Sequence, residues 1–224
     1  MPSKAKSMSA IKAAETVIET IMQMVADGRP MMQRVIPDDK VIYWEHYPDK
    51  DARDAKTLSR WYYHVHADGD RDAEEHGHFH LFLHQTQLTD PDGAWSEPSN
   101  KSEKRANVLH VAALSIDRSG IPRKWMVTNR WITDEWLYPA DKIIPHLDDF
   151  NVDNTPQDKT VNRFLTAMVA LYRGEIEQLI LKRDARFAEM GASKENREPF
   201  QKGNDVLAEL PIDLDEKLEE LGLA

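Results

Sequence analysis

The residues Glu75–His84 read EHGHFHLFLH, and residues 61–66 before them read WYYHVH. Both stretches are rich in aromatic and aliphatic residues and alternate in side-chain type, which is typical of β-strands. The charged segment 68–75 contains Gly69 and suits the turn between them. The sequence therefore predicts an antiparallel hairpin that carries six of the nine histidines of the chain.

Helical patterns flank this hairpin on both sides. Over residues 9–26 apolar side chains recur every three or four positions, which indicates one stripe of an amphipathic helix that ends near Gly28. Thr155 and Pro156 suit a helix start, and a second apolar stripe continues from there to Gly191. This stripe predicts one long, unbroken helix, and a short helix is expected over residues 140–147.

Further strands are predicted at residues 41–46, 107–116 and 122–129, the last two joined by a turn. Residues 90–105 lack periodicity and predict a mobile surface loop. We therefore expect residues 1–191 to form one α+β domain, with an antiparallel sheet of about four or five strands. The N-terminal helix and the long C-terminal helix should pack on one sheet face, leaving the histidines on the other. Residues 192–224 are predicted to form an acidic tail with a short amphipathic helix.

The composition excludes several classes of function. The net charge of −10 disfavours a nucleic-acid partner, because such binding relies on lysine and arginine. The chain has no cysteine, so disulfides, thiolate metal sites and cysteine nucleophiles are excluded. No signal peptide or membrane-spanning segment is recognisable, so we expect a cytoplasmic protein without a membrane partner.

The spacing of the histidines predicts a metal site. Residues i and i+2 of a strand point to the same side, about 6.5 to 7 Å apart, so one pair can offer two imidazoles to one ion. With residues 68–75 as the turn, His66 is expected opposite His78 and His64 opposite His80. These four side chains are the predicted ligands of a divalent transition metal, namely iron, copper or zinc.

Carboxylates near the hairpin are candidates for additional ligands. Glu75, Glu74 and Asp68 are the nearest in sequence, and Glu75 is preferred as a first- or second-shell group. His110 lies on a separate predicted strand together with Val108, Ala112 and Leu114. It is expected to join the site if that strand presents the same face.

Two resemblances can be read from the motifs. The alternating histidines at 76, 78 and 80 resemble the motif of the histidine-triad nucleotide hydrolases and transferases, which implies His78 as nucleophile and His76 and His80 as phosphate contacts. A broader resemblance is to a family of uncharacterised bacterial proteins, a domain of unknown function. It rests on EHGHFHLF at residues 75–82, together with residues 44–48, 62–66 and 128–131. That family implies no activity and no catalytic residue.

These observations leave three functional hypotheses. The first is a metal-binding protein, in its finer form a non-haem iron or copper enzyme, whose pocket is roofed by Trp95 and residues 131–136 and receives a small molecule. The second is a non-catalytic accessory or assembly protein that binds a protein partner, or a second copy, through its long C-terminal helix and acidic tail. The third is a histidine-triad-like nucleotide hydrolase or transferase. A semi-buried, hydrogen-bonded histidine face is the structural alternative to the first.

Overall fold

A computed structural model describes residues 8–37, 40–67, 69–70, 72–99 and 107–223. Within these ranges, six strands form one antiparallel sheet in the order β1-β2-β3-β4-β5-β6, so each strand pairs with its neighbour in the sequence. The strands are β1 (Tyr47–Arg53), β2 (Arg60–His64), β3 (Glu75–His84), β4 (Val108–Asp117), β5 (Pro122–Thr128) and β6 (Val206–Pro211). The α+β fold and its antiparallel sheet are as predicted, with one strand more than expected.

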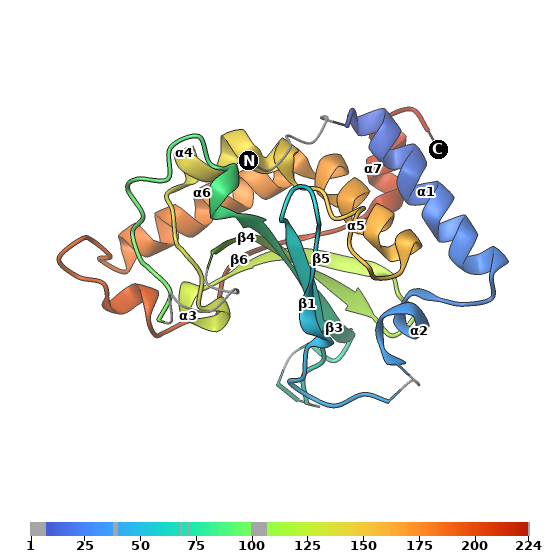
Figure 1. The fold of residues 1–224 in the computed structure, drawn as a ribbon, viewed down its shortest axis with the longest axis horizontal. Coiled ribbons are helices and arrows are strands. Elements are labelled where there is room, and N and C mark those ends of the chain that lie inside the picture. The colour runs from blue at the N-terminus through green and yellow to red at the C-terminus, as the bar shows by residue number, and fades with distance from the viewer. Residues whose placement is uncertain (1–7, 38–39, 68, 71, 100–106, 224) are drawn as a thin grey trace.

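Helices cover one side of this sheet (Figure 1). The described helices are α1 (Ala10–Ala26), α2 (Met31–Val35), α3 (Arg130–Thr133), α4 (Ala140–Ile143), α5 (Lys159–Leu171), α6 (Arg173–Glu189) and α7 (Leu214–Glu220). Short 3₁₀ turns complete them at Gln85–Gln87, Ile144–Asp149 and Glu198–Phe200. None of the helices in the described ranges combines the length and apolar character that crossing a membrane requires.

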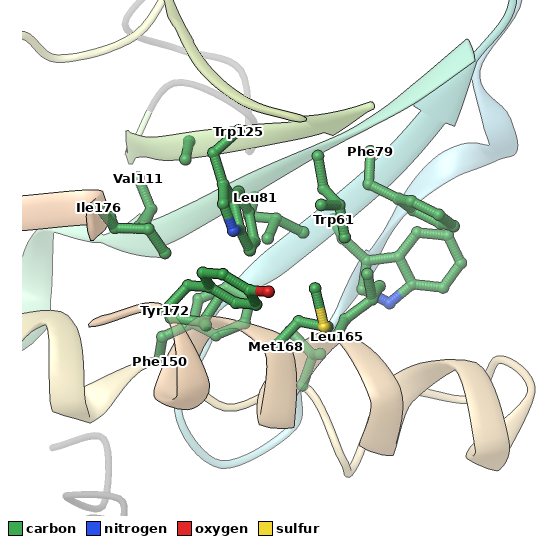
Figure 2. Close-up of a cluster of buried hydrophobic side chains, with 14 of the residues drawn as sticks. Trp61, Phe79, Leu81, Val111, Trp125, Phe150, Leu165, Met168, Tyr172 and Ile176 are labelled. Atoms are coloured by element: carbon green, nitrogen blue, oxygen red, sulfur yellow. The ribbon is translucent and has the colours of Figure 1, made fainter. Parts of the chain in front are cut away.

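The hydrophobic core lies between the sheet and helices α5 and α6. Figure 2 shows Trp61, Phe79 and Trp125 of the sheet facing Met168 and Tyr172 of the helices. The indole Nε1 of Trp61 donates a hydrogen bond of 3.0 Å to Asn162 Oδ1, so its polar atom is paired inside the core. Odd-numbered residues of β2, and of β3 from Phe79 to Leu83, supply this face, which leaves the residues between them to the opposite face.

The N-terminal helix and the second hairpin were predicted correctly. Ser9 caps α1 by accepting a hydrogen bond from the backbone N–H of Lys12, and α1 packs on α5. The predicted strand at residues 41–46 was wrong, because β1 starts only at Tyr47. Trp44 has φ 68°, a left-handed conformation that breaks an extended strand.

The predicted single long helix is also corrected, because it divides at Tyr172 into α5 and α6. Gly174 lowers helix propensity directly after the break. The Tyr172 ring packs against Trp125, and its hydroxyl donates to the backbone carbonyl of Asp213 at 3.2 Å. These contacts hold Tyr172 in a non-helical conformation.

The segment 192–224 contributes to the body of the fold. Its strand β6 pairs with β5, placing Leu210 opposite Trp125. Helix α7 follows, and its Lys217 lies 2.5 Å from Glu175 of α6. A short helix thus occurs in this segment, and it contacts its own chain. Of the loop predicted at 90–105, residues 100–105 lie outside the described ranges, while Ser96 forms a β-bridge with Leu137.

Candidate functional site

The histidine hairpin has a different register from the predicted one. His64 lies opposite His78, and Tyr62 lies opposite His80. Strand β2 ends at His64, so the connection to β3 is longer than residues 68–75 alone. A shift of two residues does not move a side chain to the other face, because the side-chain period of a strand is two. His64, His66, His78 and His80 therefore share one face as predicted, although the predicted register was wrong.

Four imidazoles converge on this face. The Nε2 atom of His78 lies 2.7 Å from His64 Nε2 and 3.1 Å from His80 Nε2. His66 Nε2 lies 3.1 Å from His64 Nε2. His64, His78 and His80 are all buried, and their candidate ligand atoms lie within 4.8 Å of one another. The structure thus brings together all four histidines that the sequence predicted as ligands.

A β-bulge at the start of β3 determines which neighbours support the cluster. Glu75 lies opposite Asp117 and Gly77 opposite Ile116, so β3 has one extra residue at this point. As a result, His76 turns to the core face, where its Nδ1 lies 2.8 Å from the Tyr63 hydroxyl. The expectation that His76, His78 and His80 share one face, on which the histidine-triad resemblance relied, was therefore wrong. Glu75 instead shares the face of His78.

A second bulge lies on β4. Phe82 of β3 pairs with His110, whereas Leu81 pairs with Ala112, so Val111 is the extra residue. Val111 and Ala112 consequently both face the core. Beyond them, the alternation is reversed, and His110 lies on the histidine face, 3.0 Å from His80 Nδ1 through its Nε2. The predicted grouping of His110 with Ala112 and Leu114 is corrected by this bulge.

Hydrogen bonds fix the orientation of two of the converging rings. Glu75 Oε1 lies 2.7 Å from His78 Nδ1, and Glu75 Oε2 accepts a hydrogen bond of 2.7 Å from Ser115 Oγ. Burial raises the pKa of Glu75, but the hydrogen bonds from His78 and Ser115 outweigh it and hold this pKa below its usual value. The carboxylate is thus ionised and accepts the His78 Nδ1 proton.

His80 is oriented in a comparable way. Its Nδ1 faces His110 Nε2, and His110 makes a further hydrogen bond to the backbone of Ala112. If the His110 proton serves Ala112, His110 Nε2 accepts from His80 Nδ1, and His80 Nε2 carries a lone pair. Burial, followed by the charges of neighbouring histidines, lowers the pKa of His80 well below its usual value. The imidazolium form of His80 is therefore disfavoured.

This arrangement fits the requirements of a metal ion. His78 Nε2 lies within 3.1 Å of both His64 Nε2 and His80 Nε2 in a buried site, so three imidazole nitrogens can reach one ion. Nitrogen ligands 2.0–2.1 Å from one tetrahedral zinc ion would lie about 3.3–3.4 Å apart. The contacts of 2.7 and 3.1 Å in the cluster are shorter than that by a few tenths of an ångström, a gap that small rotations of the rings would close. The buried trio of His64, His78 and His80 could therefore hold a metal.

The predicted oxygen ligands lie elsewhere. Glu75 contacts His78 Nδ1, and His110 contacts His80 Nδ1, so both lie on the side of these rings opposite the converging Nε2 atoms. Glu74 is exposed and pairs with Arg123. Asp68 lies outside the described residues. Among the described residues, the common point is surrounded by imidazole nitrogens.

A pocket of about 450 Å³ gives access to the cluster, with His64, His66 and His78 in its wall. Trp44, Tyr62 and Trp131 also line it. The prediction that Trp95 roofs the pocket was wrong, because Trp95 packs on Phe200 with ring centroids 6.0 Å apart. Trp44 takes this place, and its position in the aromatic run at residues 43–47 was the available signal.

Two further residues near the site were not among the predicted ligands. His46 lines the pocket, stacks on the Tyr62 ring at 3.7 Å and lies 3.4 Å from Asp51 Oδ1 through its Nδ1. Glu135 is buried and accepts a hydrogen bond from the backbone N–H of His110. Burial raises the pKa of Glu135 to about 7. Glu135 belongs to a segment without periodicity, so no sequence signal marked its burial.

A buried histidine outside the cluster predicts a loss of stability in acid. Burial, followed by Arg60 and Arg53, lowers the pKa of His84 to about 4. In the unfolded chain His84 has a pKa of about 6.5, so below that pH it binds a proton that it does not bind in the folded chain. The neutral, buried His84 therefore contributes at most about 3 kcal/mol to the free energy of unfolding. This contribution is fully present above pH 6.5 and is lost as the pH falls to about 4.

Urea unfolding between pH 7 and pH 4 measures this effect, with His84→Asn as the matched variant. His84 Nδ1 accepts the Thr86 backbone N–H at 3.3 Å, and asparagine keeps an acceptor there without titrating. The free energy of unfolding of the variant should fall less steeply with pH. Equal slopes for both proteins would contradict the prediction.

Comparisons with known proteins identify the family of this chain but no characterised relative. Neither the search of curated proteins nor the search of solved structures found a match. A family described as "Domain of unknown function (DUF6969)" matches residues 11–212, which include the whole sheet, the histidine cluster and the pocket. The resemblance to an uncharacterised family is thereby confirmed. The chain belongs to the DUF6969 family, a domain of unknown function.

Proposed function

We propose that this protein binds one divalent transition metal through His64, His78 and His80, with His66 as the fourth candidate ligand. The observation that carries the proposal is the convergence of three buried Nε2 atoms, with the rings of His78 and His80 held by further contacts at Nδ1. Anchored imidazoles are the usual second-shell arrangement of histidine metal sites.

The donor set favours copper or zinc over iron. Imidazole suits all three metals, but affinity for a given nitrogen site rises from iron to copper and is also high for zinc. Glu75 is hydrogen-bonded to His78 and does not supply the carboxylate of a two-histidine, one-carboxylate iron site. Because His64, His66 and His78 line a pocket, a bound ion would be accessible to a small molecule. This supports a metalloenzyme rather than a closed structural site.

Elemental analysis of protein purified without a histidine tag tests the proposal. Wild type should carry, or accept on loading, about one copper or zinc ion per chain, and His64→Ala and His78→Ala should retain less than about a tenth of it. His76→Gln is the control, since His76 lies on the same strand but bonds to Tyr63 on the core face. Wild type that binds no zinc, copper or iron would disprove the metal site.

A further inference from the structure

The pocket beside the histidine cluster has aromatic walls. Trp44 and Trp131 both line it, although their side chains are 55 % and 39 % exposed. Tryptophan rings are normally buried in a folded chain because of their large apolar area. Two tryptophans from distant segments that open into one pocket indicate a surface that is completed by a ligand.

The position of Trp44 is fixed by the backbone. Its φ of 68° is in the left-handed region, which is unfavourable for a bulky side chain. The backbone N–H of Trp44 donates to the Val65 carbonyl at 3.0 Å, which ties this strained residue to the end of β2. The indole meets the His66 ring edge-on, with centroids 4.3 Å apart. The strain is therefore used to hold an indole directly beside a candidate metal ligand.

The remaining walls continue the aromatic surface toward the cluster. Tyr62 is buried, stacks on His46 at 3.7 Å and lies 4.9 Å from the His80 ring. At the mouth, the exposed carboxylates of Asp70 and Asp205 line the same pocket. These groups accept hydrogen bonds and repel carboxylates, so donor substituents such as hydroxyl or amino groups suit them, and of these a hydroxyl can also present an oxygen to the cluster.

We infer that the pocket binds a small aromatic molecule bearing hydroxyl groups, with its ring between Trp44 and Trp131 and an oxygen directed at the histidine cluster. The inference rests on the proposed function, because the metal would receive that oxygen. A volume of about 450 Å³ is ample for such a molecule. The indole faces would select a planar ring by stacking.

Calorimetric titration of catechol into metal-loaded protein tests the inference, with the metal content of each sample measured separately. Wild type should bind one catechol per chain. Trp44→Leu and Trp131→Leu should each weaken binding about tenfold, whereas Trp44→Phe should stay within about threefold of wild type. Leucine keeps apolar volume without a ring, so this pair separates stacking from simple burial. Trp95→Leu, outside the pocket, should leave the affinity unchanged.

The outcomes distinguish this inference from the metal proposal. Wild type with a full complement of metal that does not bind catechol would overturn the inference and leave the metal site standing. Equal affinities of wild type, Trp44→Leu and Trp44→Phe would also overturn it, since stacking would then play no part. Protein that takes up no metal but binds catechol in a Trp44-dependent way would disprove the metal site and retain the aromatic pocket.

Discussion

Replacing Gly77 by alanine is expected to destabilise the protein by about 3 kcal/mol and to abolish its metal binding. A Cβ atom at this position would lie 2.6 Å from the Tyr63 hydroxyl and closer still to the backbone carbonyl oxygen of His64. Real Cβ atoms do not approach so closely, and a backbone oxygen of a central strand cannot move aside cheaply. The pairing of β3 with β2 beside His64 must therefore open, which separates His64 from His78.

Thermal unfolding and elemental analysis of the purified variant measure both effects. A loss of about 3 kcal/mol corresponds to a melting temperature roughly 6–12 °C lower for a chain of this size. Gly174→Ala is the matched control, because nothing lies within 4 Å of a Cβ atom there and the residue is in helix α6. Alanine favours a helix by up to about 1 kcal/mol over glycine, so the control should be slightly more stable. A Gly77→Ala protein with wild-type stability would refute the proposed close approach.

The bulges on β3 and β4 explain how a regular sheet forms this cluster. Strict alternation would have placed Glu75 and His110 on the core face, away from His78 and His80. One extra residue on each strand reverses the alternation locally, and both groups reach the histidine face. The two bulges interrupt the hydrogen-bond ladder, and they give His78 and His80 each a partner at Nδ1.

The faces of the hairpin could be predicted from the sequence, because they depend only on a period of two. His64, His66, His78 and His80 were therefore placed on one side without knowledge of the turn. The helices at both ends were likewise visible in their apolar stripes. Such features are local, and each residue that determines them lies within the element itself.

Register and bulges could not be predicted in the same way. The pairing of His64 with His78 depends on where β2 ends, and the sequence of the turn allowed a shift of two residues. Gly77 inside a strand was a signal for a bulge, because glycine often marks one. Val111 gave no such signal. The left-handed Trp44 was equally hidden, since it is held by a contact with Val65 from another segment.

Removal of the carboxylate behind His78 is expected to weaken metal binding by about 10- to 100-fold. In Glu75→Ala, the His78 Nδ1 loses its 2.7 Å acceptor, so the ring is free to rotate or to change tautomer. Ser115→Ala removes only the 2.7 Å hydrogen bond to the other carboxylate oxygen and should cost less, about threefold. Competition with a chelator of known affinity measures the metal dissociation constants of wild type, Glu75→Ala and Ser115→Ala.

Glu75→Gln separates a supporting role from direct coordination. The amide oxygen can still accept the His78 Nδ1 proton, but it carries no charge to strengthen the imidazole as a ligand. If Glu75 supports His78 from behind, the affinity of the Gln variant should lie between wild type and Glu75→Ala, about tenfold below wild type. If Glu75 were itself a ligand, Gln and Ala should be similarly damaging, because an amide is a poor substitute for a coordinating carboxylate. Equal affinity in all three proteins would show that the contact between Glu75 and His78 does not serve metal binding.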